Sequence, residues 1–318
     1  MNFKKLVKFK NELDSISQLI ETSPTTDFIK KSKKLNNLNF QDKETKSLLS
    51  RCARICDEEE VKKKPLLRVI HHFACSGGTL ISKCLSALPN VYVLSEVHPL
   101  SKNHLHNELK YCPTDITTLA RYANVPDADE LAVKLFIRNV IDTEKFIRER
   151  GGILVIREHT HMDYCLGGAA NTQSTVNECL KEHFELKHIV TVRDPVDSYH
   201  SLKLNKWVQF TPDSFDEYCK RLSIFISHYK TEDITKYEDF VSLPEQHLEN
   251  ICTLLELPYN ERFNDIFDIF KVTGDSGRRG VKIEPRERRK LSKQFYKEIK
   301  SSSYYRKLAK KLNYKKIT

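Results

Sequence analysis

The feature that most constrains the fold is an apolar run, a small-residue turn and a helical pattern, in that order, over residues 66–85. The run from Leu66 to Ile70 is interrupted only by Arg68, and residues 81–85 (ISKCL) have a helical pattern. Between them lie residues 71–80, HHFACSGGTL. In α/β proteins such a turn lets backbone N–H groups converge on an anion, and the helix N-terminus adds a favourable dipole. The sequence therefore predicts a parallel-sheet domain that holds a phosphate after its first strand.

The turn contains Ser76-Gly77-Gly78-Thr79, in which two glycines remove the Cβ atoms that would prevent close approach of an anion. The ATPase form of this motif, GxxxxGK followed by Ser or Thr, needs lysine at the position of Gly78. We therefore expect a phosphate ligand that is held without that lysine.

Short apolar runs alternate with helical patterns after residue 66, which is typical of a parallel sheet. Strands are predicted at residues 66–73, 91–94, 153–157 and 186–192, with a weaker one near 233–237. Helices are predicted over 3–21, 43–56 and 113–150, and after 243 apart from a loop at 272–284. The expected fold class is α/β: a three-layer P-loop-type parallel sheet flanked by helices, with N-terminal and C-terminal helical additions. The expected parts are a helical extension over 1–64, the α/β domain over 65–290, and a basic helical tail over 291–318 packed on it.

The positive charge of the chain is concentrated near its C-terminus. The formal net charge is +10, but residues 278–318 hold sixteen Lys and Arg against three Glu, a net charge of +13, so the remainder carries about −3. Such a segment faces a polyanion, a membrane surface or an anionic small ligand, or is simply the solvated side of helices. The sequence has no RNA-binding aromatic motif or helix-turn-helix signature, so we expect no specific nucleic acid partner.

Cysteine usage and hydropathy indicate the compartment. The nine cysteines are scattered, and none are paired at CxxC spacing, so a disulfide framework or a zinc ribbon is not predicted. Reduced thiols fit the cytoplasm. No apolar run reaches the ~20 residues of a membrane span, and the first residues lack the apolar core of a secretory signal. We therefore expect a cytoplasmic protein without a transmembrane segment.

A second segment, residues 188–201, places polar groups after another strand. A buried-type strand ends in Arg193, and the two residues that follow it suit the start of a helix. Ser201 lies eight residues beyond Arg193, two turns into that helix. Ligands in open α/β sheets bind at the carboxyl ends of the strands, so Arg193 should lie at the same edge of the sheet as the loop at 76–79. A salt bridge from Arg193 to Asp194 or Glu238 is the alternative interpretation.

Together these segments resemble the sulfotransferase family. Ser-Gly-Gly-Thr follows the first strand, Arg-x7-Ser follows a later one, and Tyr237-Glu238-Asp239-Phe240 comes after both. The chain continues as Leu243-Pro244 and residues 251–259 (ICTLLELPY), and the loop at 274–280 (GDSGRRG) occupies the place of the family's nucleotide loop. The resemblance covers roughly residues 66–290. It implies an enzyme that uses 3′-phosphoadenosine 5′-phosphosulfate (PAPS) as sulfuryl donor and needs no metal.

The resemblance implies donor-binding roles position by position. The 5′-phosphosulfate would be held by the loop of Cys75, Ser76, Gly77, Gly78 and Thr79, and the 3′-phosphate by Arg193, Ser201, Arg278 and Arg279. A guanidinium fork suits a phosphate dianion. Many relatives have Lys or Arg at the position of Cys75, so Lys83 or Arg157 would supply the missing catalytic charge. Otherwise the enzyme is slow, or the fold binds a nucleotide without transferring sulfate.

Sulfuryl transfer also needs a base that removes the acceptor proton. The predicted strand at 153–156 leads into residues 157–161 (REHTH), where relatives have Lys-x-His. His159 is the candidate base, because imidazole titrates near neutral pH. The alternatives are His161, Glu158 and Glu96.

The leading hypothesis is a PAPS-dependent sulfotransferase that moves a sulfuryl group to a hydroxyl or amine. We expect the acceptor to be a small molecule or a glycan, and the oligomeric state is open, with a homodimer as one arrangement. A phosphotransferase that uses ATP or GTP is the first alternative, since residues 153–158 and 189–194 are apolar runs that end in an acid, as in a strand that binds magnesium. A non-catalytic protein that binds a nucleotide or a polyanion is the second.

Overall fold

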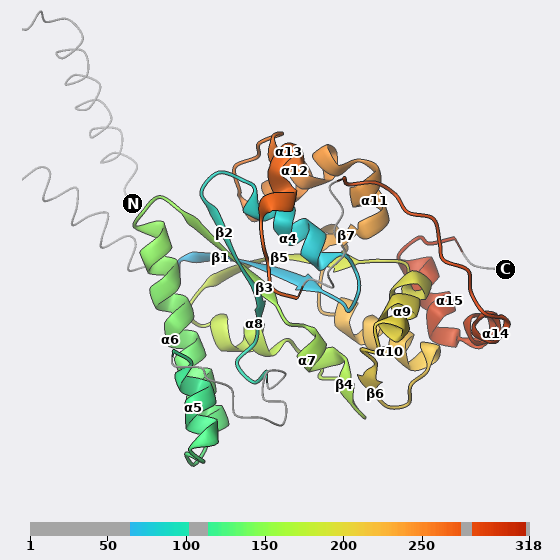
Figure 1. Ribbon diagram of the computed structural model, residues 1–318, viewed down its shortest axis with the longest axis horizontal. Helices are drawn as coiled ribbons and strands as arrows, with labels where there is room; N and C mark the ends of the chain where they lie inside the picture. Colours follow the sequence, from blue (N-terminus) through green and yellow to red (C-terminus); the bar gives the residue numbers. More distant parts are fainter. Residues whose placement is uncertain (1–63, 102–113, 275–281, 316–318) are drawn as a thin grey trace, which may run out of the picture. The chain divides into compact units, whose positions relative to one another are not determined.

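Five parallel strands form the central sheet of the protein (Figure 1). The computed structural model describes residues 64–101, 114–274 and 282–315. The strands are β1 (Leu66–His72), β2 (Val91–Val97), β3 (Ile153–Glu158), β5 (Glu185–Val192) and β7 (Ile234–Lys236), in the spatial order β2-β3-β1-β5-β7. All five predicted strands are present, and the P-loop-type parallel sheet is confirmed. The helices predicted over 3–21 and 43–56 lie outside the described residues.

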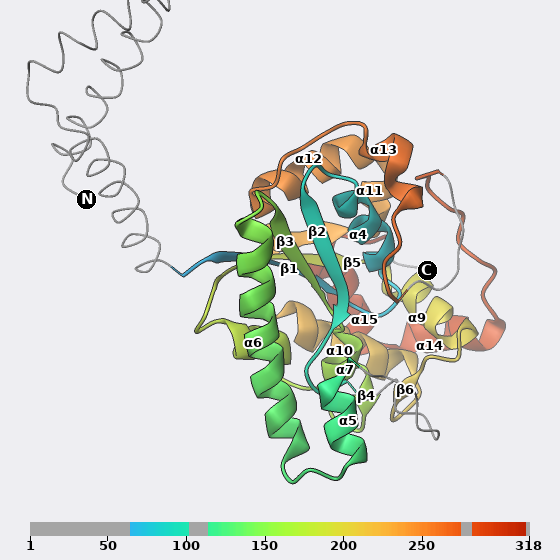
Figure 2. The same ribbon diagram turned by 60° about the vertical axis from the view of Figure 1, so that its left-hand side comes forward.

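Helices cover both faces of the sheet, so the described chain has three layers (Figure 2). One face is covered by α4 (Gly78–Ser86), α11 (Tyr237–Ser242), α12 (Pro244–Leu255) and α13 (Phe263–Ile266), and the other by α6 (Ala128–Arg148), α8 (Thr175–Leu180) and α10 (Phe215–Ile226). Side chains alternate along a strand, so Ile70 of β1 packs with α4 while Leu67 and Val69 pack with α6. The same alternation sorts the polar side chains at the strand ends.

The connections between strands change direction beside β1. The chain leaves β1 through α4 to reach β2 at one edge of the sheet, and it leaves β5 to reach β7 at the other edge. Strands whose connections diverge leave a crevice at their carboxyl ends, where ligands of open α/β sheets bind. β1 and β5 pair from Leu66↔Glu185 to His72↔Thr191. The loops that follow these two strands therefore start side by side.

The single helix predicted over 113–150 is wrong, because the described chain has two helices there. These are α5 (Ile116–Tyr122) and α6, and the break between them surrounds Pro126. Proline disfavours a helical conformation in the residue before it. The flanking Asn124 and Asp127 have positive φ angles of 53° and 54°, which ends one helix and reorients the chain for the next.

The short elements that complete the described chain lie mostly near the ends of the strands. They are α7 (His161–Tyr164), β4 (Leu166–Gly167), α9 (Pro195–Leu204), β6 (Gln209–Phe210), the 3-10 turns Thr231–Asp233 and Phe267–Ile269, α14 (Lys293–Ser301) and α15 (Ser303–Lys311). β4 and β6 pair in parallel as a separate two-stranded sheet. Within the described ranges, no helix combines the length and the apolar character that crossing a membrane requires.

The chain does not return to a helix directly after the predicted loop at 272–284. Residues 282–292 continue without helical structure until Ser292, whose hydroxyl caps α14 by accepting a hydrogen bond from the Phe295 N–H at 3.1 Å. Two features explain the delay: Pro285 cannot donate a helical hydrogen bond, and Arg288 is held by ion pairs with Asp194 at the start of α9.

The basic C-terminal helices bury an apolar stripe. Phe295 and Ile299 of α14 and Tyr305 and Leu308 of α15 join the core that includes Phe215 of α10. The lysines at 293, 297, 300, 307 and 310 point away from this core and are exposed. Much of the positive charge of the tail is therefore on the solvated side of amphipathic helices.

Candidate functional site

The turn between β1 and α4 has the backbone conformation of an anion-binding loop. Cys75 and Gly77 adopt positive φ angles of 61° and 87°, and α4 begins at Gly78. A Cβ on Gly77 would lie 2.3 Å from Cδ2 of Tyr237, and a Cβ on Gly78 would lie 2.7 Å from Cγ of His72. Both glycines are needed for close packing, and the N-terminus of α4 stays open to an anion.

Replacing Gly77 by Ala should lower the free energy of unfolding by about 1–3 kcal/mol, because a non-glycine residue is strained at this φ and its Cβ clashes with the Tyr237 ring. Urea denaturation followed by circular dichroism measures the change. Gly168→Ala is the matched control, since an added Cβ there meets open space. Equal stability of the two variants would show that the loop relaxes without cost.

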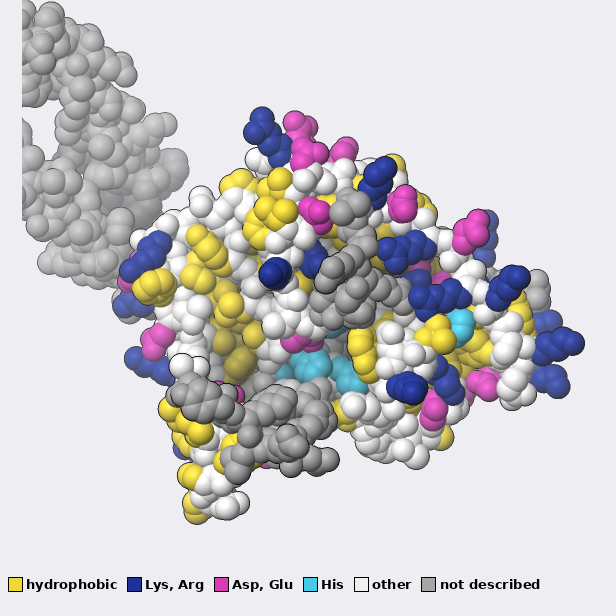
Figure 3. Space-filling model, viewed as in Figure 1, with side chains coloured by type: hydrophobic (Ala, Val, Ile, Leu, Met, Phe, Trp, Pro, Cys, Tyr) yellow, Lys and Arg dark blue, Asp and Glu magenta, His cyan; other side chains and the backbone are white. Residues whose placement is uncertain are grey.

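A cavity of about 700 Å³ opens at the carboxyl ends of the strands. Figure 3 shows histidine side chains gathered at the centre of this face of the molecule. The predicted site residues that line the cavity are Cys75, Ser76, Gly77, Gly78, Thr79, Lys83, Arg157, His159, Arg193 and Ser201. Arg278 and Arg279 lie outside the described residues. The structure thus brings together segments that are more than a hundred residues apart in the sequence.

Arg193 reaches the cavity without a carboxylate partner. Its guanidinium carbon lies 5.0 Å from the centroid of the Tyr237 ring, and none of the described carboxylates is within ion-pair distance of it. The carboxylates proposed as its salt-bridge partners are used elsewhere. Asp194 pairs with Arg288 at 2.5 Å, and Glu238 accepts hydrogen bonds from the Asp194 N–H at 2.9 Å and from another hydroxyl. The guanidinium is therefore available to an anionic ligand.

Glu238 connects the C-terminal tail to the end of β5. Its second carboxylate oxygen accepts a hydrogen bond from the Tyr314 hydroxyl at 3.0 Å, while the first holds the backbone N–H that directly follows Arg193. Burial raises the pKa of Glu238, and the hydrogen bonds it accepts oppose that shift. The Tyr237-Glu238-Asp239 segment therefore helps to position the end of β5.

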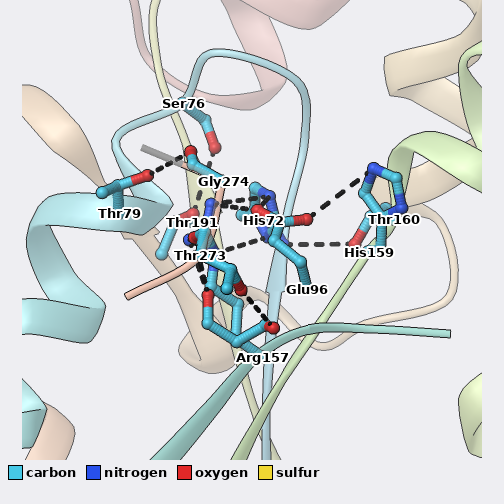
Figure 4. Close-up of polar contacts among 11 residues, drawn as sticks. His72, Ser76, Thr79, Glu96, Arg157, His159, Thr160, Thr191, Thr273 and Gly274 are labelled. Carbon is cyan, nitrogen blue, oxygen red and sulfur yellow. Dashed lines mark hydrogen bonds and ion pairs between the residues drawn. The ribbon is translucent and has the colours of Figure 1, made fainter. Parts of the chain in front are cut away.

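A bulge in β2 turns Glu96 toward Arg157 (Figure 4). The register of β2 against β3 shifts between Ser95 and Val97, and Glu96 has a positive φ of 60°. Nη2 of Arg157 lies 2.6 Å from Oε1 of Glu96, and Nη1 donates to the Ser95 hydroxyl at 2.9 Å. The Arg157 side chain is only 3% exposed. Its charge is therefore paired with Glu96 at the cavity, which Lys83 of α4 also lines.

His72 completes this cluster on the floor of the cavity. Nε of Arg157 donates to Nδ1 of His72 at 3.3 Å, and Nε2 of His72 lies 3.4 Å from Oε1 of Glu96. Burial and then the charge of Arg157 lower the pKa of His72. Burial alone would raise the pKa of Glu96, but His72, Arg157 and His159 together lower it to about 2. Glu96 is thus an ionised carboxylate and a weak base at neutral pH.

His159 follows β3 and faces the same cavity. Its Nε2 lies 3.7 Å from Oε2 of Glu96, and its ring stacks on that of His161 with centroids 6.1 Å apart. Burial lowers the pKa of His159, although the charge of Glu96 opposes the shift. Nε2 of His161 lies 3.2 Å from the side-chain oxygen of Gln209. A neutral imidazole beside an ionised carboxylate can accept a proton, because the carboxylate stabilises the imidazolium that forms.

Glu158 is directed away from the cavity. It shares its side of β3 with Leu154 and Ile156, and its carboxylate lies 2.5 Å from Nδ1 of His71 and accepts from the Ser174 hydroxyl at 2.5 Å. Together with the pairing of Asp194 to Arg288, this means that neither acid considered for a magnesium site offers its carboxylate to the cavity. His71 and His72 face opposite sides of the sheet, as neighbours on a strand do.

The half-buried position of His161 makes stability depend on pH. Burial, and then the charge of His159, lower the pKa of His161 from 6.5 to about 4. Between these values the unfolded chain binds a proton that the folded chain does not, so this stability is complete above pH 6.5 and is lost as the pH falls through 4. Between pH 7 and pH 4 we expect wild type to lose roughly 1–3 kcal/mol more free energy of unfolding than His161→Gln.

Urea denaturation at fixed pH values measures this difference. His183→Gln removes an exposed histidine from another part of the chain and should keep the wild-type pH dependence. Parallel stability curves for wild type and His161→Gln would contradict the prediction.

Several residues in or next to the cavity are not identified by the sequence analysis. Thr191 lies under the loop, with its hydroxyl 3.1 Å from that of Ser76. Trp207, the single tryptophan, is 42% exposed and lines the cavity with Gln209. Thr191 is two residues before Arg193 on a strand, so the alternation of side chains was a usable signal. Arg286 also lines the cavity, but no local sequence pattern indicates it. It lies in a basic segment whose path depends on the tertiary structure.

No protein-family model matches the chain, and no curated protein matches it. Among solved structures, the sulfotransferase domain of the Synechococcus PCC 7002 olefin synthase is similar, with a TM-score of 0.41 and 18% identity over 63% of this chain and 77% of that one. A sulfotransferase of Alicyclobacillus acidocaldarius has a TM-score of 0.36 and 13% identity, covering 63% and 88%. A mouse sulfotransferase complexed with PAP has a TM-score of 0.36 and 12% identity, covering 78% and 89%. With TM-scores below 0.5, these similarities do not by themselves say what this chain does.

Proposed function

We propose that the protein is a sulfotransferase that uses PAPS to sulfate a hydroxyl or amine. The observation that carries this proposal is the meeting of two anion-binding features at one cavity. One is the lysine-free glycine loop at the N-terminus of α4, and the other is Arg193, which no described carboxylate neutralises. A donor with a 5′-phosphosulfate and a 3′-phosphate presents one anion to each feature.

The residues of the cavity fit such a donor by their chemistry. The loop from Ser76 to Thr79 supplies backbone N–H groups for the 5′ end, and Lys83 supplies the charge that the position of Cys75 lacks. Arg193 and the Ser201 hydroxyl supply donors for the 3′-phosphate. The cavity volume of about 700 Å³ is within the range of about 300–1,000 Å³ that small-molecule sites occupy.

In the proposed reaction, His159 removes the proton of the acceptor. The acceptor oxygen or nitrogen forms a bond to sulfur while the bond from sulfur to the bridging phosphate oxygen breaks, and the electron pair stays on that oxygen. The products are a sulfated acceptor, 3′,5′-adenosine bisphosphate and the proton held by His159. Glu96 stabilises the imidazolium, and Arg157 positions Glu96. The exposed ring of Trp207 and the amide of Gln209 lie on the acceptor side, near His161.

The test is a thermal-shift comparison of three ligands with the full chain: 3′,5′-adenosine bisphosphate, ADP, and ATP with magnesium. A ligand that binds only the folded state raises the melting temperature. We expect the bisphosphate to give the largest shift, with no requirement for magnesium. A shift with ATP and magnesium, and none with the bisphosphate, would instead support the phosphotransferase. Binding of the bisphosphate without turnover of PAPS on any acceptor would support a nucleotide-binding protein.

A further inference from the structure

The helices α14 and α15 present an exposed surface that is almost entirely basic. Residues 293–311, which form both helices, contain seven Lys and Arg and a single carboxylate, Glu298, for a net charge of +6. In Figure 3 Lys and Arg side chains gather at the right-hand edge of the molecule, where Figure 1 places α14. All seven cations are exposed, and we call them the basic face: Lys293, Lys297, Lys300, Arg306, Lys307, Lys310 and Lys311.

The packing of the two helices fixes the direction of the basic face. The apolar stripes of α14 and α15 are buried in one core with α10, so the cations of both helices point away from that core. Ser302 joins the helices, and its hydroxyl donates to Asp216 of α10 at 2.5 Å. Nη1 of Arg306 donates to the carbonyl of Lys300 at 2.8 Å. The basic face is therefore held on a packed support, and its apolar stripes are not available to another partner.

The basic face lacks the ion pairs that other helices of the protein make. On α6, Lys134 lies 2.7 Å from Glu130, one turn away, and similar pairs recur along this helix. None of the seven cations of the basic face forms an ion pair with a carboxylate in the described part of the chain. Like charges one turn apart, such as Lys293 and Lys297, destabilise a helix. Solvation alone gives no reason for this cost, whereas an anionic partner does.

The side chains of the basic face fit an anionic lipid surface better than a nucleic acid. Six of the seven are Lys, a hydrated point charge, whereas Arg is the residue that proteins favour for nucleic acids and for individual phosphates. Tyr296, which is 41% exposed, lies next to Lys297 and three residues after Lys293. Tyrosine is enriched where proteins meet the headgroups of a bilayer, because its ring is apolar and its hydroxyl is polar.

We propose that the basic face is a docking surface for the anionic headgroups of a lipid bilayer. The protein adsorbs there by charge and does not insert, since the apolar stripes of both helices are already buried in the protein. The attraction acts over about 8 Å, the Debye length at physiological ionic strength. This role goes beyond the proposed function and does not depend on it, because none of the seven cations lines either cavity beside Arg193.

Co-sedimentation of the full chain with vesicles tests the docking surface. The vesicles consist of phosphatidylcholine alone or of phosphatidylcholine mixed with phosphatidylserine. We expect binding to the mixed vesicles only, and its loss at an ionic strength of about 1 M, where the Debye length is about 3 Å. The combination of Lys293→Gln, Lys297→Gln and Lys300→Gln should weaken binding by about 10- to 100-fold, because three charges leave the surface. The melting temperature should stay unchanged, since these side chains are exposed.

The matched control removes three exposed lysines from α6 and α8. The combination of Lys134→Gln, Lys145→Gln and Lys181→Gln has the same net charge as the α14 variant and should bind the mixed vesicles within about twofold of wild type. Equal weakening by the two combinations would mean that binding follows total charge, and the docking surface would be wrong.

Two further outcomes would also overturn the docking surface. One is a wild-type protein that does not bind the mixed vesicles at low salt. The other is a wild-type protein that binds single-stranded RNA and leaves the vesicles unbound, which would assign the basic face to a nucleic acid. Neither outcome bears on binding of 3′,5′-adenosine bisphosphate, so the proposed function is tested separately.

Discussion

Replacement of His159 by Ala is expected to slow sulfuryl transfer by about 10²–10⁴-fold, the usual contribution of a positioned general base. Affinity for 3′,5′-adenosine bisphosphate should stay within about threefold of wild type, because in the proposed reaction His159 contacts the acceptor and the loop at 76–79 and Arg193 bind the phosphates. The measurement is the initial rate of bisphosphate release from PAPS, with the acceptor that gives turnover in a panel of alcohols, amines and glycans.

The pH profile of the wild-type enzyme adds a second readout for His159. Burial lowers its pKa, so the neutral imidazole persists at neutral pH and the rate should fall only when the pH drops through a value below 6.5. His183→Ala is the control, since this histidine is exposed and is absent from the cavity lining. A His159→Ala enzyme with wild-type turnover, combined with an inactive Glu96→Gln, would assign the base to Glu96.

Replacement of Arg193 by Ala is expected to weaken 3′,5′-adenosine bisphosphate by about 10²-fold, since a bidentate guanidinium–phosphate contact is among the strongest that proteins make. The fold should tolerate the change, because Arg193 pairs with no carboxylate of the described residues and its main contact is the Tyr237 ring. Calorimetric titration measures the affinity, and the melting temperature without ligand checks the fold.

The control for Arg193→Ala is Arg138→Ala, which removes an exposed arginine on α6 that pairs with Asp142. It should leave affinity for the bisphosphate unchanged. If Arg193→Ala also weakened 5′-AMP by 10²-fold, Arg193 would contact the 5′ end of the ligand, and the two anion-binding features would have to exchange roles.

Much of the sheet follows from the sequence alone. The apolar runs ending at His72, Glu158 and Val192 are buried on both faces, as parallel strands are, and each forms the strand that its pattern predicts. The glycine pair after β1 reports a local requirement for small residues, so it locates the anion-binding loop without tertiary information. The start of helix α6 is harder to predict from the sequence. The apolar periodicity continues across Pro126, although the proline disfavours a helix there.

Alternation along the strands also contains information about the site. On β5, Ile189 and Thr191 share a side with Arg193, and on β3 Val155 shares a side with Arg157. The same rule places Glu158 with Leu154 on the other face. Alternation along each strand therefore predicts which of these charged side chains lie on the same face of the sheet and which lie on the opposite face.

Only the tertiary structure determines which of these arginines is paired with a carboxylate. Arg157 and Arg193 both follow apolar runs, yet the bulge in β2 gives Arg157 a carboxylate partner at 2.6 Å, whereas Arg193 has none among the described carboxylates. Likewise, Arg286 lines the cavity two residues before Arg288, which pairs with Asp194, 94 residues away in the sequence. Sequence patterns report periodicity and local conformation. Charge pairing depends on distances of a few ångströms between segments that only the packed fold brings together.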